Sequence, residues 1–422
     1  MIWTKKIKAG ALQFVLFIGA VIAVLLLSFV LVSYSHTLFH KKTDVTVNLI
    51  HMADVGLNYS FSKDLLDGEQ ITVPTIGEVT MDVSVENSYW GLFEKRTSVA
   101  KHKKIQFTKI GLVGQIDENR PALYLKDNQR PVIIAGNAKI SGTTYLPEQG
   151  IRMGNIYGNS YHRDNLIYGK QKKSSSTLPA LDSELQQQIK MLTQPFYEPQ
   201  GEEVLYKEGM VLKNSFKEET VIIKGNVLNL DEIVLSGNII IWATDKISVS
   251  VNSQLNDVIL VAPEIIIQDW TKGNFQAFAS NRIWVGKGCE LFYPSALVVH
   301  KKSQKKENKK GNPTTDIFID SNTVIRGVVL HQDMGEANKF LPQIKVDKNA
   351  KIIGELYCSN NLELKGSVNG SVTTGNFIAL ENGSIYQNHL YNGIINSLSL
   401  PIEYAGLQYK GSINNGIMKW LY

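Results

Sequence analysis

Few residues of this sequence combine the types and the spacing that catalysis requires. Cleavage of a polysaccharide needs carboxylates, or carboxylates with Lys or Arg, clustered on one outer face of the fold. The nearest set consists of Asp257, Asp269, Arg282 and Lys287. These residues do not fall at matching positions of the repeated segments that contain them. We therefore interpret the chain as non-enzymatic, with a polysaccharide-cleaving protein as the less favoured alternative.

Aromatic residues in the same part of the chain are compatible with a binding role. An exposed ring stacks on a sugar, whereas a buried ring packs in a core. The sequence does not distinguish these two roles, so surface polysaccharide stays open as a partner. The rings concerned are those of Trp242, Trp270, Trp284, Phe292 and Tyr293.

The strongest charge feature is a run of Lys residues. Six Lys lie within residues 300–310. Such a run attracts anionic glycans or lipid headgroups in a salt-dependent manner, but it is also typical of a solvated loop between two strands. The formal net charge is only +5, so we expect no nucleic-acid partner. The candidate patch for an anionic partner consists of Lys301, Lys302, Lys305, Lys306, Lys309 and Lys310.

Histidine and cysteine residues lack the spacing of a metal site. His36 and His40 are four residues apart, but no carboxylate or third ligand lies near them in sequence. Cys289 and Cys358 are far apart and belong to no CxxC motif. We expect no metal and no other cofactor, and a disulfide between the two cysteines stays open.

The elements that must position these side chains are short β-type runs in residues 221–299 and 317–385. β-branched residues dominate them, helical periodicity is absent, and Gly, Asn and Asp separate them. Three turns that begin at Ala243, Ala262 and Ala279 align, and their starts are 19 and 17 residues apart. This spacing is too short for a strand–helix–strand unit. It predicts a mainly β protein built on a parallel β-helix, a solenoid that adds one coil per repeat.

Stacked apolar ladders should form the interior of these coils. Ile247, Ile266 and Ile283 hold the same position after their turns, and Leu362 and Phe377 continue the series. Each fully buried aliphatic side chain contributes about 1.5–3 kcal/mol.

The N-terminal segment predicts a membrane anchor. Residues 9–33 carry no charge, and as a helix they would span about 37 Å, enough to cross a hydrocarbon core of about 30 Å. Lys5, Lys6 and Lys8 precede this segment, which predicts a cytoplasmic N-terminus. We predict a single-pass, uncleaved anchor in the inner (cytoplasmic) membrane of a bacterial cell. The bilayer is then a partner, and the main domain is periplasmic or otherwise extracytoplasmic.

The start of the anchor resembles that of type IV pilin-like proteins. Residues 6–10 read Lys-Ile-Lys-Ala-Gly, and residues 11–16 read Ala-Leu-Gln-Phe-Val-Leu. In that family a basic leader ends in Gly and a hydrophobic helix follows, so the resemblance implies cleavage between Gly10 and Ala11. Residues 53–62 resemble the segment after the membrane helix in minor pilins and pseudopilins of the large PilX-like, leader-type-K class.

One position departs from the pattern of the major pilins. They carry Glu at the fifth mature position, where this chain has Val15. Some minor, tip-located members also lack that Glu, so the resemblance implies a priming or tip subunit with other pilin-like subunits as partners. The alternative is a plain signal anchor in which Gly10 has no role.

The remaining chain divides by pattern. An apolar stripe of Val45, Leu49, Met52 and Val55 predicts a helix, and alternation in residues 79–85 predicts an antiparallel sheet. A short amphipathic helix is expected at residues 181–192. We predict a cytoplasmic leader (1–8), a transmembrane helix (9–34), a membrane-proximal α+β region (35–130), a first β-helix coil (131–156), a linker or insertion (157–203), the parallel β-helix (204–390) and a C-terminal cap (391–422).

The last coils resemble bactofilins, the polymer-forming β-helix proteins. Gly354, Gly366, Gly370 and Gly383 recur at their turns. Bactofilins polymerise through uncapped terminal coils, whereas apolar residues after position 388 are expected to cover the last coil here. We therefore predict a membrane-anchored structural or assembly protein of the cell envelope, pilin-like, that presents a β-helix for adhesion or docking. A bactofilin-like envelope scaffold is the alternative.

Overall fold

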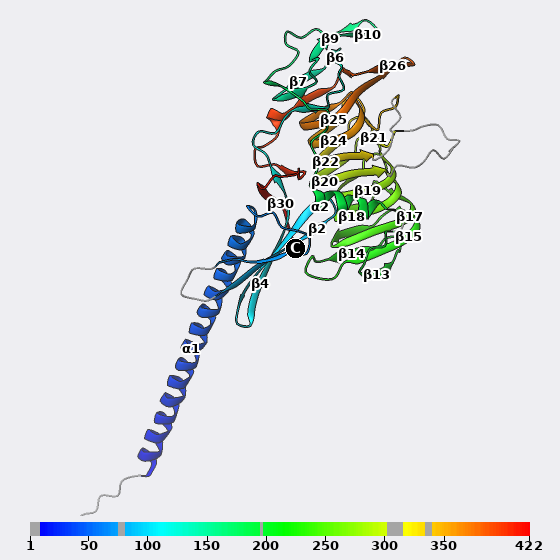
Figure 1. Ribbon diagram of the computed structural model, residues 1–422. Coiled ribbons are helices and arrows are strands. Elements are labelled where there is room, and N and C mark those ends of the chain that lie inside the picture. The colour runs from blue at the N-terminus through cyan, green and yellow to red at the C-terminus, as the bar shows by residue number, and fades with distance from the viewer. Residues whose placement is uncertain (1–8, 75–80, 195–196, 302–314, 334–339) are drawn as a thin grey trace, which may run out of the picture.

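The computed structural model describes residues 9–74, 81–194, 197–301, 315–333 and 340–422. Within these residues the protein is mainly β and has one long N-terminal helix, as predicted. This helix, α1, projects as a rod from a body built of strands (Figure 1).

The helix α1 runs without a break over Ala9–Ser60, 52 residues, which corresponds to about 78 Å. Every large apolar side chain from Leu12 to Phe39 is exposed. This part of α1 is long and apolar enough to cross a membrane. The helix continues well past residue 34, where the predicted membrane segment ends.

The end of α1 packs on an antiparallel sheet. Leu49, Ala53 and Leu57 are buried against Val83 and Val85. Of the predicted apolar stripe, Leu49 is buried here and Val45 and Met52 pack partly against the same cluster, whereas Val55 does not belong to it. The strand order is β1-β2-β3-β4, with β29 and β30 both paired to β4. Its strands are β1 (Gln70–Thr72), β2 (Asp82–Trp90), β3 (Phe93–His102), β4 (Ile105–Ile116), β29 (Ala405–Gly406) and β30 (Asn415–Leu421).

A buried guanidinium group fastens the end of α1 to this sheet. Arg96 on β3 is fully buried and donates to the carbonyl oxygen of Ser60, the last residue of α1, and to that of Lys63 at 3.3 Å. Its Nε and Nη2 also donate to Glu94 Oε2 at 3.0 and 2.7 Å. The last carbonyl groups of a helix lack intrahelical partners, and a cation stabilises them. Arg96 therefore fixes the direction in which α1 leaves the body.

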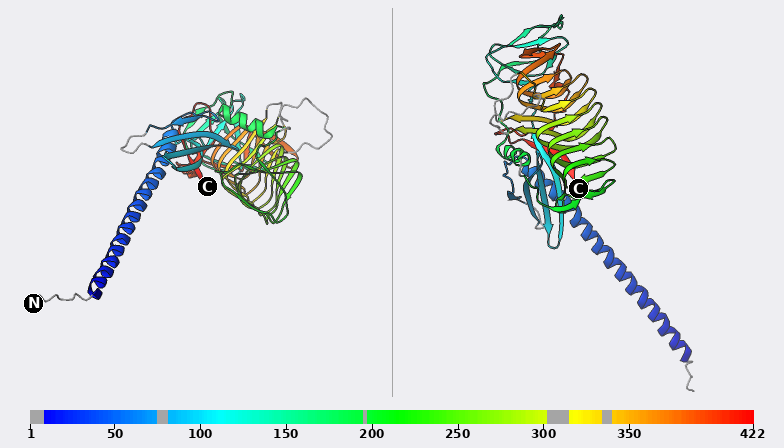
Figure 2. Two further views of the ribbon diagram at one scale, coloured as in Figure 1. Left: turned by 90° about the horizontal axis from the view of Figure 1, so that it is seen from below. Right: turned by 90° about the vertical axis from the view of Figure 1, so that its right-hand side faces the viewer.

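The second and larger sheet is parallel. From β13 onward, each strand pairs in register with the strand one repeat later. The long strands bend, and they pair with the next strand on both sides of the bend. For example, β15 pairs with β17 on both sides of a register shift between Gly225 and Val227. Figure 2 shows the strands stacked in successive layers. The strands are β5 (Leu123–Leu125), β7 (Lys139–Ser141), β8 (Thr144–Leu146), β12 (Gln171–Lys173), β13 (Glu202–Leu205), β14 (Val211–Asn214), β15 (Val221–Leu230), β16 (Val234–Gly237), β17 (Ile239–Val249), β18 (Gln254–Ile267), β19 (Lys272–Val285), β20 (Glu290–Lys301), β21 (Ile317–Ile319), β22 (Val324–Asp333), β23 (Ile344–Val346), β24 (Lys351–Leu364), β25 (Ser367–Glu381) and β28 (Ile394–Asn396).

Small additions complete the fold at one end of the parallel sheet. The strand β26 pairs antiparallel with β25, a three-stranded sheet has the order β27-β6-β9, and β10 pairs with β11. A 3₁₀ turn follows β28 at Ser397–Ser399. The bounds are β26 (Ser384–Gln387), β27 (His389–Tyr391), β6 (Val132–Ala135), β9 (Ile151–Met153), β10 (Asn155–Ile156) and β11 (Asn159–Ser160).

A ladder of apolar side chains fills the interior of the parallel sheet. Its members pair in register from strand to strand, and all of them are buried. The prediction is confirmed for Ile247 and Ile283 but is wrong for Ile266, because Ile265 holds that position. The turn after Ala262 is one residue shorter than its neighbours, and a shift of one residue moves a side chain to the opposite face. The ladder is Leu228, Ile247, Ile265, Ile283, Ile317, Ile344, Leu362 and Phe377.

Residues 131–156, the expected first coil, lie at the end of the parallel sheet beside β25 and not beside β13. β5 pairs with β25, β7 pairs with β28, and β8 and β12 follow outward from β5. The order along the chain therefore differs from the order in space. Figure 1 shows β6, β7 and β9 beside β25, far from β13. The linker after β12 then returns along the sheet to its opposite end.

The C-terminal residues form the expected cap only in part. Leu390 is buried, and β28, which belongs to the predicted cap, pairs with β25 beside β5. Leu398 and Ile402 are exposed. Beyond them the chain joins the antiparallel sheet, where β30 pairs with β4, and so ties the parallel sheet to the α1 module.

One outer side of the parallel sheet is apolar and buried. The antiparallel sheet and the helix α2 (Ser183–Thr193) cover it, and α2 lies close to the predicted residues 181–192. The side chain of Asp182 caps α2 by accepting from the backbone N–H groups of Glu184 and Leu185. The side chains covered in this way include Ile240, Ile259, Phe278, Val298 and Leu330.

Both cysteines are free and buried inside the parallel sheet. Burial raises the pKa of Cys289 to about 11 and the pKa of Cys358 to about 12. Both residues therefore behave as small core side chains and not as reactive thiols.

Replacing Arg96 should loosen α1 from the body. The substitution Arg96→Ala leaves the Glu94 carboxylate buried without its partner, and we expect a loss of about 3–5 kcal/mol in unfolding free energy. Hydrogen exchange of the amides near Ser60 should accelerate, as mass spectrometry of the full chain would show. Lys101→Ala, at an exposed position of the same strand, is the control and should change stability by less than about 0.5 kcal/mol. An equal, small effect of both variants would contradict the fastening role.

Candidate functional site

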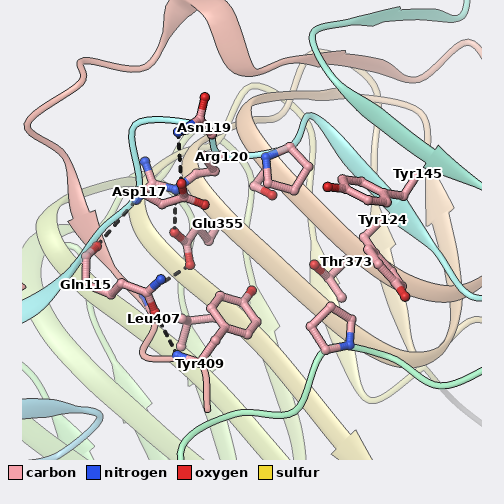
Figure 3. A pocket seen from close by; sticks show the side chains of 13 residues that line it. Gln115, Asp117, Asn119, Arg120, Tyr124, Tyr145, Glu355, Thr373, Leu407 and Tyr409 are labelled. Atoms are coloured by element: carbon pink, nitrogen blue, oxygen red, sulfur yellow. Dashed lines mark hydrogen bonds and ion pairs between the residues drawn. The ribbon is translucent and has the colours of Figure 1, made fainter. Parts of the chain in front are cut away.

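A pocket of about 390 Å³ lies where several segments of the chain meet. We call it the junction pocket. Its walls come from the turn after β4, the outer side of β24 and β25, the strands β5 and β8, and the segment around β29 (Figure 3). Its lining residues are Gln115, Asp117, Asn119, Arg120, Pro121, Tyr124, Tyr145, Pro179, Glu355, Ser371, Thr373, Leu407 and Tyr409.

A buried ion pair forms the base of the junction pocket. Arg120 Nε lies 2.9 Å from Glu355 Oε1, and the two side chains are 9% and 4% exposed. Glu355 Oε2 accepts the backbone N–H of Leu407 at 3.0 Å. Burial raises the pKa of the Glu355 carboxyl, whereas Arg120 opposes this shift. The pair joins the parallel sheet to both the turn after β4 and the C-terminal segment.

Two tyrosines support the ion pair from behind. The Arg120 guanidinium lies 4.9 Å from the ring centroid of Tyr404, and its Nη2 donates to the Tyr404 carbonyl oxygen at 3.1 Å. The hydroxyl of Tyr404 donates to the carbonyl oxygen of Gly327, and that of Tyr293 donates to the carbonyl oxygen of Ala405. Burial raises the pKa of Tyr404 well above its usual value. These phenols are therefore neutral hydrogen-bond donors that hold the C-terminal segment in place.

The opposite wall consists of stacked aromatic rings. Tyr124 and Tyr145 occupy paired positions on β5 and β8, with ring centroids 5.3 Å apart and planes inclined by 28°. Lys172 on β12 follows Tyr145 in the same column, and its Nζ lies 5.3 Å from the Tyr145 ring centroid. Figure 3 shows both rings facing the pocket across from Tyr409.

The register of the parallel sheet explains why the pocket lies here. One outward column runs through Phe278, Val298, Leu330 and Tyr357, all covered by other segments. The same column continues as Thr373, Tyr124, Tyr145 and Lys172. The pocket therefore opens where the cover over this side of the sheet ends.

The geometry favours binding over catalysis. Both oxygens of Glu355 accept hydrogen bonds from the protein, and Arg120 is held by Glu355 and by carbonyl oxygens. Neither group is left to transfer a proton or to attack a substrate. What faces the pocket is the Asp117 carboxylate with a set of hydroxyl, amide and aromatic groups, which suit recognition of a polar ligand.

The four residues considered for polysaccharide cleavage do not form a catalytic cluster. Asp257 binds Lys419 Nζ at 2.6 and 2.9 Å, and its carbonyl oxygen accepts from Trp90 Nε1 at 3.0 Å, so it joins the two sheets. Asp269 accepts the backbone N–H of Lys287 at 2.8 Å. Arg282 pairs with Glu264 at 2.9 Å.

The five aromatic residues divide between exposed and covered positions. Trp242 and Tyr293 are partly buried against the cover. Trp270, Trp284 and Phe292 are exposed. Trp284 packs on Phe318 with ring centroids 4.2 Å apart and borders a second, shallower hollow with Ile266 and Asp269.

The Lys patch falls largely outside the described residues, which exclude residues 302–314. Lys301 is described, and it pairs with Asp316, whose Oδ2 also accepts from His331 Nε2 at 2.9 Å. His36 and His40 stack on the exposed helix with centroids 4.5 Å apart. In the described part of the chain, no group of three His, Cys, Asp or Glu residues is arranged to hold a metal ion.

Sequence reasoning missed the junction pocket. Its residues come from six separate stretches of chain, and none of them forms a motif. One signal was present: Glu355 interrupts a run of apolar residues in a strand, as Gln276 does in another. Both lie in the same outward column and bind backbone groups of the covering segments.

Removing Glu355 should open the junction. Glu355→Ala leaves the Arg120 guanidinium buried without its counter-ion, so we expect a loss of about 3–5 kcal/mol, seen as faster hydrogen exchange at Leu407 and Tyr409. The double variant Arg120→Met with Glu355→Leu removes both charges and should recover most of that loss. A double variant as unstable as the single one would show that the ion pair is not the source of the effect.

Comparison with protein-family models, curated proteins and solved structures gives no match for this chain. A functional assignment therefore depends on the geometry of the chain itself.

Proposed function

We propose that this chain is a membrane-anchored, non-enzymatic structural or assembly protein of the bacterial cell envelope. In this proposal it is a pilin-like component of a pilus or secretion system, and its parallel sheet is a β-solenoid that presents a surface for adhesion or docking. The body lies outside the inner membrane, and the N-terminus is cytoplasmic.

The observation that carries the proposal is the single unbroken helix α1. Its first part exposes apolar side chains to every side, and its last part is buried under an antiparallel sheet. A membrane anchor attached through a flexible linker would not need this continuity. One rigid helix shared by the membrane and the body supports a subunit that transmits its position in a membrane assembly to its surface domain, as the pilin-like resemblance implies.

The register of the parallel sheet supports a solenoid. An in-register ladder of eight apolar residues runs through it, and successive strands pair at equivalent positions. Gly327, Gly354 and Gly370 also pair in one column, with φ values of 139°, 140° and 148°. A Cβ atom on Gly354 would lie 2.0 Å from the carbonyl oxygen of Gly327. These features describe a repeated, tightly stacked turn.

A bactofilin-like scaffold is favoured by a different observation. At one end of the parallel sheet, β13 exposes Glu202, Glu203 and Leu205, and at the other end β12 exposes Lys172 and Lys173. Opposite charges on the two ends would suit head-to-tail stacking of copies.

The N-terminus tests the pilin-like proposal. We expect the protein purified from its native membrane to begin at Ala11, because a leader peptidase that recognises the basic segment cleaves after Gly10. Intact-mass spectrometry measures this directly. A chain that still begins at Met1 would refute the pilin-like proposal and leave an ordinary anchored protein.

A matched pair of variants sharpens the test. Gly10 and Gly19 both lie in α1 with no atom within 4 Å of an added Cβ, so valine at either position should leave the body intact. Gly10→Val should abolish cleavage, whereas Gly19→Val should be processed normally. Equal processing of both variants would show that Gly10 is not recognised.

Sedimentation distinguishes the pilin-like proposal from the bactofilin-like scaffold. We expect the full chain in lipid nanodiscs to sediment as discrete particles, because the pilin-like proposal places the contacts between subunits in the membrane helix. A scaffold would form long polymers that Lys172→Glu with Lys173→Glu disperses, because the charges then repel Glu202 and Glu203. Lys287→Glu, at an exposed turn of the same sheet, is the control. Polymers that only the double variant disperses would favour the scaffold.

A further inference from the structure

We infer that the junction pocket binds an uncharged saccharide ring. This inference rests on the proposed function in one respect, because it requires the body to face the cell surface or periplasm, where glycans occur. It assigns the ligand class of a site that is defined by its geometry alone.

The charges of the junction pocket favour an uncharged ligand. Arg120 is the one cation among the described residues that line it, and Glu355 neutralises it at 2.9 Å. Asp117 also lines the pocket, and its Oδ1 accepts the backbone N–H of Asn119 at 2.9 Å. Among the lining residues an anionic sugar would therefore meet a carboxylate and no free cation, which disfavours its binding. Lys172 lies outside this lining, where its Nζ donates to the Tyr145 hydroxyl at 3.3 Å.

The walls offer the apolar surface that a sugar ring needs. The paired rings of Tyr124 and Tyr145 form one wall, and Pro121, Pro179 and Leu407 add further apolar surface. The C–H face of a saccharide stacks on aromatic rings, while its hydroxyl groups point to the sides. A pocket with aromatic walls and polar groups at its edges matches both parts of such a ligand.

The floor holds a hydroxyl group that is free for a ligand. Ser371 and Thr373 line the pocket and are only 5% and 3% exposed. Ser371 directly follows Glu355 in the same outward column. Gln276 and Glu355 in this column bind covering segments, but the Ser371 hydroxyl has no partner among the described residues. A hydroxyl group that lines a pocket and has no protein partner is available to a ligand, and a sugar hydroxyl can bond to it.

The exposed aromatic surface around Trp284 is the competing location. Trp284 and Phe318 pack on each other at 4.2 Å, and the hollow beside them is lined by Ile266, Ile267, Gln268, Asp269 and Gly286. It offers a stacking ring but no buried hydroxyl group. This surface supplies the control for the experiment.

The test uses the full chain in lipid nanodiscs, because detergents with sugar headgroups would compete. Isothermal titration calorimetry is performed with tetrasaccharides of three charges: neutral cello- and maltotetraose, cationic chitosan tetramer and anionic tetragalacturonate. We expect a neutral tetrasaccharide to bind and the anionic one to bind at least tenfold more weakly. Absence of binding by both neutral tetrasaccharides, or tightest binding by the anionic one, would overturn the inference.

Variants locate the binding site. Tyr145→Ala removes a stacking ring, and Ser371→Ala removes the free hydroxyl group, so each should weaken binding by about tenfold. Trp284→Ala should leave the affinity unchanged. Unchanged melting temperatures establish that all three variants are folded. Loss of binding in Trp284→Ala with retention in the other two would move the site to the exposed aromatic surface and refute the inference.

This outcome is independent of the N-terminal test. A chain that begins at Ala11 but binds no neutral tetrasaccharide would refute the saccharide site and retain the pilin-like proposal. A chain that begins at Met1 but binds through Tyr145 and Ser371 would refute the pilin-like proposal and retain the saccharide site.

Discussion

The structure depends on the burial of one apolar outer side of the parallel sheet. The sheet fills its interior with its own side chains, but residues such as Ile259, Phe278 and Leu330 point outward and must be covered. The antiparallel sheet, α2 and the C-terminal segment provide that cover. Burial of apolar surface contributes about 25 cal/mol for each Å², so this contact holds the two sheets together. The direction of α1 relative to the parallel sheet follows from it.

Polar contacts then fix the register of the cover. Gln276 exchanges hydrogen bonds with the backbone of Trp90 and Leu92, Asp257 binds Lys419, and Glu355 binds Arg120 and Leu407. Each of these groups would be costly to bury without its partner. They therefore add little net attraction, but they penalise any other placement of the covering segments. The junction pocket is the place where this series of contacts stops and the outward column of the sheet remains accessible.

The last part of α1 and the C-terminal strand meet in the same module. Leu49, Ala53 and Leu57 of α1 pack on the antiparallel sheet, and β30 returns to β4 after the parallel sheet is complete. Arg96 holds the end of α1 with buried hydrogen bonds. A displacement of α1 would therefore be passed to the body as a whole. The proposed function as a membrane-anchored subunit relies on this rigidity.

The sequence by itself determined the local elements, because these depend on neighbours along the chain. The uncharged run from residue 9, the stripe through Leu49, the alternation through Val83 and Val85, and the β-type runs with their turns all predicted the observed helices and strands. Tertiary structure decided the rest. The shorter turn after Ala262 placed Ile265 in the ladder in place of Ile266. The segment with β5 and β7 joined the far end of the sheet, and Arg120 met Glu355 across 235 positions of the sequence, the difference of their numbers. Such contacts depend on which surfaces bury each other, and no periodicity along the chain records that choice.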